Sequence, residues 1–462
     1  MRKAAAVKIS ESSGEARANL PPILEQRFGP MEYRRLDSVI AYAGNPRKHP
    51  ERQIVQLMAS MREFGFAMPL LVDSTSTLIC GHARLEAARR LGVETAPVLV
   101  AAFWSPAQVK AYRLADNQLA AAATWDSELL RIELDSIIEI AEVPIELLGW
   151  STGEIDVILD GEGGDGSDPA DDVPEPPAIS VARKGDLWLL GKHRLLCDSS
   201  LDAGAWERLM DGATAAMSLN DPPYNVRVNG HVSGSGRHAE FAFASGEMTD
   251  VEFTTFNATY LENMKAHLKD GAIIMAFMDH AHLAELMAAG RRVGLKHVNL
   301  CVWVKTNGGM GSLWRSQHEL VLVLKHGTAP HTNAVELGKH GRYRTNVWTA
   351  AGANSFGSSR DQDLADHPTV KPIQLLVEAI RDVTRQGEIV LDAFSGSGST
   401  ILACERSKRI GYAIEIEEKY IDVAVRRWEA MTGKQAILEG TGETLADAAV
   451  RRGAETATAN IS

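Results

Sequence analysis

Short apolar runs alternate with segments of amphipathic helical spacing over residues 213–431. Such alternation is typical of a mainly parallel sheet with helices on both faces, because each crossover helix returns the chain to the start of the next strand. The sequence therefore predicts a doubly wound α/β fold for this region. We expect strands at 213–219, 271–278, 297–304, 318–325, 387–393 and 410–416. We expect helices at 251–268, 280–293, 371–385, 399–406 and 417–431.

An acidic segment rich in Gly and Pro, residues 151–182, divides the chain of 462 residues. It contains nine Asp or Glu residues and no Lys or Arg, so it has little to bury and repels itself. We therefore expect a flexible linker here. A smaller α+β domain with a helical extension is expected at 31–150 and a large α/β domain at 183–440. The ends, 1–30 and 441–462, are expected to be flexible.

The net charge of −12 at pH 7 does not exclude a nucleic-acid partner. Nine of the negative charges belong to the acidic segment, so the rest of the chain carries a net charge of −3. Residues 301–360 have seven basic and two acidic side chains, and such a local positive charge is compatible with binding phosphates. No apolar run approaches the ~20 residues of a membrane span, and the N-terminus lacks the apolar core of a signal peptide. Four scattered cysteines form no metal or disulfide motif. We expect a cytoplasmic protein with no membrane partner and no metal site.

The strand expected at 213–219 leads directly to the tetrapeptide Asp221, Pro222, Pro223 and Tyr224. In open α/β sheets, ligands bind beyond the carboxyl ends of strands, which is where this tetrapeptide lies. The Asp221 carboxylate and the Pro222 carbonyl can accept both hydrogens of an exocyclic amino group, while Tyr224 stacks on its ring. The alternative is a proline turn with no catalytic role.

The strand expected at 387–393 leads to a glycine turn that opens a helix. Gly396 and Gly398 allow a ligand to approach the backbone, and the helix N-terminus favours an anionic group. The turn lacks the Gly-Lys-Ser/Thr of triphosphate-binding loops. Glu415 follows about twenty residues later, near the end of the next strand, where an acid can accept hydrogen bonds from ribose hydroxyls. A surface charge at a strand end is the alternative for Glu415.

With these motifs in this order, residues 183–440 resemble the amino-group DNA methyltransferases, which use S-adenosylmethionine. Because the tetrapeptide precedes the glycine turn, the resemblance implies a Rossmann-like sheet in the permuted β order. The sequence H-P-T-V-K-P at 367–372 is similar to an element of the family. The resemblance implies cofactor contacts by Asp198, Thr369, Lys371, Asp392, Phe394, Gly396, Gly398 and Glu415. Trp303, Lys305, His318 and Glu319 also look typical of the family, but the resemblance assigns them no catalytic role.

The resemblance implies direct methyl transfer to the exocyclic amine of a base flipped out of double-stranded DNA. D-P-P-Y resembles the adenine version, so we expect a site-specific adenine-N6 methyltransferase of the restriction-modification kind, with cytosine N4 as the alternative. Methylation of a ring carbon needs a Pro-Cys nucleophile, which the sequence lacks. A protein-glutamine methyltransferase would resemble N-P-P-Y proteins with the opposite motif order.

Two segments are expected to contact DNA. The basic region 328–360 is expected to hold phosphates or read bases through Arg342, Arg344 and Asn346. The Ser- and Gly-rich residues 228–246 are expected to form a mobile loop that closes over the flipped nucleotide.

Residues 31–125 resemble the N-terminal fold of ParB proteins, which is related to sulfiredoxin. The resemblance rests on N-P-R-K at 45–48 and G-H-A-R-L-E-A-A at 81–88, and it implies a nucleotide whose phosphates bind at Gly81 and Arg84. The sequence at 115–118 departs from the family pattern, which argues against nucleotide hydrolysis. We expect an accessory DNA-docking or nucleotide-sensing module. The alternative for the whole chain is a ParB-like nucleotide-dependent DNA-binding protein with an inactive methyltransferase scaffold, and a homodimer stays open.

Overall fold

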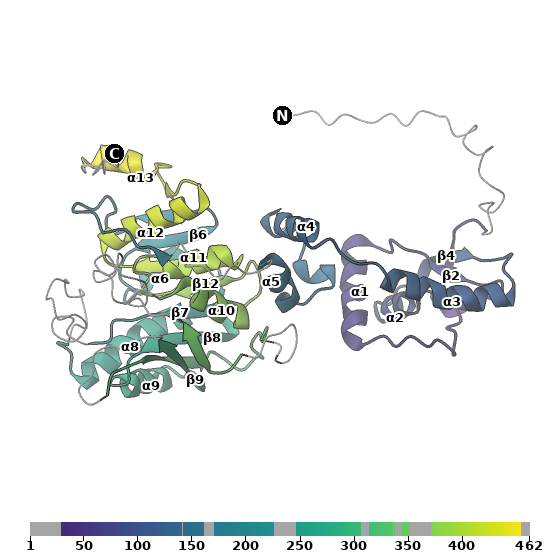
Figure 1. The fold of residues 1–462 in the computed structure, drawn as a ribbon, viewed down its shortest axis with the longest axis horizontal. Helices are drawn as coiled ribbons and strands as arrows, with labels where there is room; N and C mark the ends of the chain where they lie inside the picture. Colours follow the sequence, from purple (N-terminus) through teal and green to yellow (C-terminus); the bar gives the residue numbers. More distant parts are fainter. Residues whose placement is uncertain are drawn as a thin grey trace. The chain divides into compact units, whose positions relative to one another are not determined.

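The computed structural model describes residues 29–140, 142–160, 171–225, 246–305, 314–335, 337, 344–350 and 371–453. The chain forms two compact units (Figure 1). The N-terminal unit comprises Met1–Leu130 and Glu142–Trp150, and the C-terminal unit comprises Arg131–Ala141 and Ser151–Ser462. Among the described residues, no helix is long and apolar enough to span a bilayer.

A four-stranded sheet with the strand order β1-β4-β2-β3 forms the centre of the N-terminal unit. Strands β2 and β4 are parallel, whereas β1 pairs with β4 and β2 with β3 in antiparallel fashion. Leu70, Val72 and Val98 of the sheet are fully buried and belong to one core with Leu85 of helix α2. The bounds are β1 Glu32–Arg35, β2 Leu70–Val72, β3 Leu78–Cys80, β4 Thr95–Val100, α1 Glu51–Phe64, α2 His82–Arg90 and α3 Pro106–Ala121.

The C-terminal unit contains a ten-stranded sheet with the order β11-β9-β10-β8-β7-β12-β13-β6-β5-β14. Its centre is parallel, from β8 through β7, β12 and β13 to β6, and β10 runs antiparallel between β8 and β9. This mixed α/β sheet has the doubly wound architecture expected from the sequence. The strands are β5 Leu187–Leu190, β6 His193–Cys197, β7 Ala215–Asn220, β8 Leu268–Met278, β9 Lys296–Lys305, β10 His318–Lys325, β11 Val347–Ala350, β12 Ile389–Asp392, β13 Ile410–Glu415 and β14 Ile437–Leu438.

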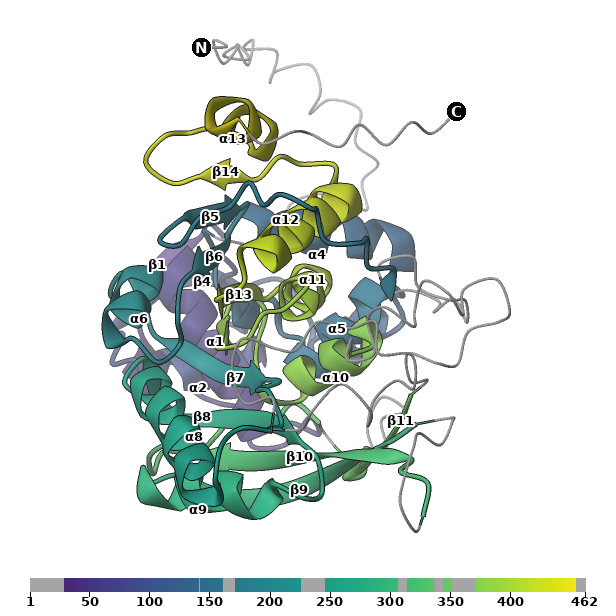
Figure 2. The same ribbon diagram turned by 90° about the vertical axis from the view of Figure 1, so that its left-hand side faces the viewer.

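Helices cover both faces of this sheet (Figure 2). Side chains of β8 alternate between the two cores: Ile273 and Met275 pack with helices α10, α11 and α12, and Ile274 and Ala276 pack with α6, α8 and α9. A strand buried on both faces explains why β8 reads as a continuous apolar run. The helices are α6 Ala203–Met210, α8 Asp250–Lys265, α9 Leu283–Arg292, α10 Ile373–Val383, α11 Ser399–Arg406 and α12 Glu418–Thr432.

The expected acidic linker is wrong at its N-terminal end, where residues Thr152–Asp160 form helix α5. Asp156 of this helix is only 2% exposed, and its carboxylate lies 2.7 and 3.1 Å from the two terminal nitrogens of the Arg409 guanidinium. Further along, the Asp171 carboxylate accepts a hydrogen bond of 2.8 Å from the Ile373 N–H. These acids pair inside the C-terminal unit, so composition alone gave a misleading prediction for them.

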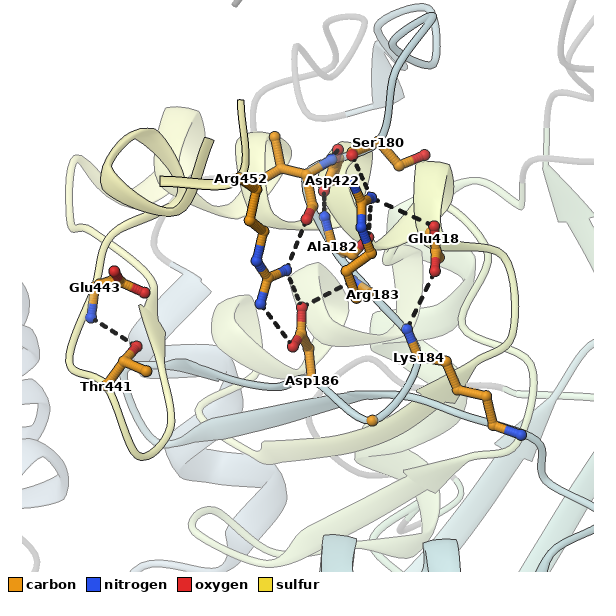
Figure 3. A network of polar contacts seen from close by, with 12 residues as sticks. Ser180, Ala182, Arg183, Lys184, Asp186, Glu418, Asp422, Thr441, Glu443 and Arg452 are labelled. Carbon is orange, nitrogen blue, oxygen red and sulfur yellow. Dashed lines mark hydrogen bonds and ion pairs between the residues drawn. The ribbon is translucent and has the colours of Figure 1, made fainter. Parts of the chain in front are cut away.

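The expected flexible C-terminal tail is wrong in the same way, because Leu445–Arg452 form helix α13. Thr444 and Asp447 make a capping box at its start, a signal that the sequence contained. Arg452 near its end makes a bidentate ion pair with Asp186, at 2.5 and 2.9 Å, and also donates to the Val181 carbonyl (Figure 3). Residues 454–462 lie outside the described part of the chain.

Candidate active site

The tetrapeptide and the glycine turn lie at the same edge of the sheet. Strand β7 ends at Asn220, directly before Asp221, and pairs in parallel with β12, which ends at Asp392. The Asn220 side chain is buried and accepts a hydrogen bond of 3.1 Å from the Ala393 N–H. The segment before the glycine turn is therefore tied to the end of the strand that carries Asp221.

Two carboxylates, two lysines and a phenol form one network at this edge. The Asp221 carboxylate accepts a hydrogen bond of 2.8 Å from the Tyr224 hydroxyl and lies 2.5 Å from Lys371 Nζ. Glu319 lies 3.2 Å from the same ammonium and 3.1 Å from the Tyr224 hydroxyl. The other oxygen of Glu319 lies 2.6 Å from Lys305 Nζ. With Glu319 and Lys371 exposed by only 15% and 6%, the four charges balance in a largely dry environment.

The network sets the protonation of its members. Burial raises the pKa of Asp221, and the Glu319 carboxylate adds to this rise while Lys371 opposes it. For Glu319, burial also acts to raise the pKa, but Lys371 and Lys305 outweigh it and bring the pKa to about 2. Burial acts to lower the pKa of Lys371, yet the two carboxylates raise it overall. Burial and the same carboxylates raise the pKa of Tyr224. Lys371 is therefore a persistent cation, and Glu319 is the more acidic of the two carboxylates.

The glycine turn contains two positions whose backbone conformation favours glycine. Gly396 and Gly398 have φ values of 51° and 86°, and Gly398 is the N-cap of α11. A side chain at Gly398 would place its Cβ 2.7 Å from that of Ala424, whereas the space at Gly396 is open. The absence of a side chain at Gly398 therefore allows α11 to pack closely against α12. At Gly396 it leaves an open space beside the turn, which we call the cradle.

Acidic residues lie close to the glycine turn, and one of them, Glu415, contacts Gly396 directly. Glu415 at the end of β13 accepts hydrogen bonds from the N–H groups of Gly396 (2.7 Å) and Glu417 (2.8 Å), and its carbonyl accepts the Asp198 N–H at 3.0 Å. Asp392 accepts a hydrogen bond from the Phe394 N–H, and burial raises its pKa to about 7. Within the part of the chain that the structure describes, the buried Ser395 hydroxyl has no hydrogen-bond partner.

This donor set fits a nucleoside with a cationic tail. Carboxylates accept hydrogen bonds from ribose hydroxyls and attract an ammonium or sulfonium group, and the unpaired Ser395 hydroxyl offers one more contact. A triphosphate would instead meet the carboxylates Asp198 and Glu415 without a lysine in the turn. The residues present therefore fit S-adenosylmethionine.

Three residues of this site received no role from the sequence. Glu319 is the second residue of β10, which runs antiparallel next to β8, and Lys305 ends β9, so both reach the edge that carries Asp221. Arg427 of α12 is 5% exposed and donates hydrogen bonds to the Ser397 carbonyl (2.7 Å) and hydroxyl (2.8 Å). Charged residues at strand ends were a visible signal for Glu319 and Lys305, whereas nothing in the motif pointed to Arg427.

The remaining expected site residues either have partners within the chain or fall outside the described residues. Arg344 is 17% exposed and pairs with Glu378 and with Asp382, at 3.0 Å for the latter. Asn346 donates to the Leu300 carbonyl at 3.0 Å. Thr369 and Arg342, and residues 228–245 of the expected loop, lie outside the described residues.

The N-terminal unit places Gly81 and Arg84 together at the start of α2. Gly81 has φ of 102° and is the N-cap, and a Cβ there would lie 3.2 Å from the Arg84 guanidinium. Burial and a hydrogen bond with Asp116 raise the pKa of Cys80 to about 12, which disfavours a reactive thiolate.

A phenol and a carboxylate beside a glycine turn lined by acids, on a doubly wound sheet, define a group-transfer enzyme with a nucleoside cofactor. Comparison with known families agrees. Residues 215–426 match the DNA methylase family of the N6/N4 type, residues 33–117 match the ParB N-terminal domain, and residues 128–184 match the ParB-methyltransferase HTH domain. The chain thus carries an N6/N4 DNA methylase domain together with a ParB N-terminal domain and a ParB-methyltransferase HTH domain.

Some individual relatives are methyltransferases and another is a ParB-like protein, and each matches only part of this chain. The chain is 28% identical over 226 residues to the type II methyltransferase M2.DpnII of Streptococcus pneumoniae, which covers 46% of this chain and 82% of the relative. It is 24% identical over 225 residues to M2.MboI of Moraxella bovis, with 47% and 81% covered. The ParB-like nuclease domain-containing protein YnaK of Escherichia coli is 40% identical over 68 residues, which cover 15% of this chain and 78% of YnaK. The chain is accordingly an S-adenosylmethionine-dependent, amino-group DNA methyltransferase.

Proposed function

We propose that this protein methylates the exocyclic N6 amine of adenine in double-stranded DNA. The observation that carries the proposal is the Asp221 carboxylate, held 2.8 Å from the Tyr224 hydroxyl at the sheet edge shared with the glycine turn. An exocyclic amine is a poor nucleophile because its lone pair is delocalised into the ring. Accepting its hydrogens at Asp221 and Pro222 favours a tetrahedral nitrogen, and Tyr224 stacks on the base.

Cofactor binding is assigned to the other half of the sheet. We propose that Glu415 and Asp198 hold the adenosine end, and that Asp392, Phe394, Gly396 and Gly398 line the pocket. Thr369 and Lys371 complete the assigned set. When bound, S-adenosylmethionine supplies an electrophilic methyl group. The chain's contribution is to fix the amine in line with that group and to exclude water.

The choice of adenine rests on Asp221, the first residue of a tetrapeptide that resembles the adenine version. The target base cannot reach a pocket at the sheet edge while stacked, so it is flipped out. The test is incubation with radiolabelled S-adenosylmethionine and DNA of mixed sequence, followed by digestion and identification of the labelled nucleoside. Labelled N6-methyl-2′-deoxyadenosine supports the proposal. Labelled N4-methyl-2′-deoxycytidine would show the same reaction on cytosine in place of adenine, and DNA without label would contradict both.

We further propose that the N-terminal unit binds the phosphates of a nucleotide at Gly81 and Arg84. Support comes from the left-handed Gly81 at the N-terminus of α2, with the Arg84 guanidinium beside it. Calorimetric titration with the four ribonucleoside triphosphates tests this. We expect binding that Arg84→Ala removes and Arg62→Ala, on the neighbouring helix α1, leaves unchanged.

A further inference from the structure

The lysine of the active site occupies a position that suits the target amine. Lys371 Nζ lies 2.5 Å from Asp221 and 5.7 Å from the centre of the Tyr224 ring. The lysine thus donates N–H groups to Asp221, the carboxylate proposed to bind the amine of the base. It does so beside Tyr224, the ring proposed to stack on that base. We propose that Lys371 is a placeholder for the target amine at Asp221 in the DNA-free protein, and that Glu319 receives this lysine when the base enters. This inference rests on the proposed function.

Lys371 reaches Asp221 from the protein interior, whereas part of the Asp221 side chain is exposed to solvent. The Lys371 side chain is 6% exposed and also packs 5.1 Å from the centre of the Phe277 ring, so it approaches from the interior. The Asp221 side chain is 29% exposed. A base arriving from solvent therefore meets the carboxylate on its open side and competes there with the ammonium.

A buried ammonium needs a carboxylate partner in either state. Loss of a partner from a buried ion pair is strongly unfavourable, and the two carboxylates keep Lys371 charged by raising its pKa. Glu319 already lies 3.2 Å from Lys371 Nζ, so the exchange needs side-chain rotation only. Lys305 fixes the other Glu319 oxygen at 2.6 Å, which keeps the receiving carboxylate in place. Glu319 is thus a positioning residue that acts through Lys371.

The proposal predicts that one substitution compensates for another. Glu319→Gln keeps a hydrogen-bond acceptor but loses the charge, so Lys371 prefers Asp221 and competes more strongly with the base. Lys371→Met removes the competitor. We therefore expect Glu319→Gln to lower kcat/KM for DNA at least about tenfold, and Glu319→Gln/Lys371→Met to recover a substantial part of this loss. Glu262→Gln, at an exposed ion pair with Lys265 on α8, is the matched control and should behave as wild type.

The kinetics are measured at saturating S-adenosylmethionine on a duplex that the labelling experiment identifies as substrate, and the cofactor Kd of each variant is measured by calorimetry. A second readout needs no turnover: with 2-aminopurine at the target base, the fluorescence increase on binding should be smaller in Glu319→Gln and restored in the double variant. The placeholder role of Lys371 is contradicted if Glu319→Gln has the kcat/KM for DNA of the wild type. It is also contradicted if kcat/KM of the double variant is no higher than that of Glu319→Gln. A wild-type protein that labels no DNA contradicts the proposed function instead.

Discussion

Arg427 on α12 donates a hydrogen bond of 2.7 Å to the carbonyl of Ser397, in the middle of the glycine turn. The same nitrogen reaches the Ser397 and Ser399 hydroxyls, so one buried guanidinium fixes three groups of the turn. The turn's shape therefore depends on a helix that begins after Glu415, well downstream of the motif. A cradle that is fixed before the ligand arrives loses less entropy on binding.

Substitution of Arg427 should weaken cofactor binding. Arg427→Met keeps the apolar stem but releases the turn, and we expect the S-adenosylmethionine Kd to rise about tenfold. Arg426→Met, at the exposed neighbouring position, is the control. Calorimetric titration checks both, and an equal effect of the two substitutions would refute a specific role for Arg427.

Substitution of Asp221 should separate chemistry from cofactor binding. Asp221→Ala removes the carboxylate that holds the amine, so methyl transfer to DNA should fall about 100-fold or more. Lys371 keeps Glu319 as its carboxylate partner, and the cofactor residues Glu415 and Asp198 are untouched, so the Kd for S-adenosylmethionine should stay within a few fold of wild type. Measurement of label transfer and of cofactor binding on the same preparation checks this, and full activity would remove the catalytic assignment.

The ion pair between Asp156 and Arg409 should make α5 important for stability. The two side chains are 3% and 0% exposed, so Asp156→Ala leaves a buried charge unpaired and should cost about 3–5 kcal/mol. Asp156→Leu/Arg409→Met should cost less than Asp156→Ala, because it removes both charges. Urea unfolding followed by circular dichroism measures the midpoints. A flexible linker at this position predicts no change in any variant.

Helix α13 should also contribute to stability. The Arg452 pair with Asp186 is 13% and 12% exposed, so Arg452→Met should lower the free energy of unfolding by about 2 kcal/mol. Arg451 pairs with Glu443 and is 49% exposed, so Arg451→Met should cost less than about 1 kcal/mol. Thermal unfolding of the two variants tests the difference, which a dispensable tail would not show.

Asp392 should give the folded protein a pH dependence. Because burial raises its pKa to about 7, the folded state holds a proton that the unfolded state releases near pH 4. Its contribution to stability is therefore fully present below pH 4 and is lost as the pH rises through about 7. Asp392→Asn has no such titration, so its urea midpoint should increase relative to wild type between pH 5 and pH 8. A constant difference between the two proteins would show that Asp392 is not protonated in the fold.

The sequence was sufficient to predict strands that are buried on both faces and are followed directly by a recognisable motif. Strands β7 and β12 are continuous apolar runs followed by D-P-P-Y and the glycine turn, so both their position and their edge could be inferred. The charge of Glu319 near a strand end was a visible signal, but its place beside Asp221 was not, because that depends on β10 running antiparallel next to β8, a tertiary choice that no local pattern encodes. The acidic segment was misread because composition counts charges without their partners, and Asp156 finds its partner at Arg409, far away in the chain.

The hydrogen bond from the Ala393 N–H to the Asn220 side chain joins two halves of one continuous sheet. The paired ends of β7 and β12 therefore hold the proposed acceptor and donor residues at a fixed separation. Under the proposed function, the nucleic acid must then distort until its nucleotide reaches these residues. Duplexes that already contain a mismatch or an unpaired nucleotide at the target should accordingly be captured with less strain.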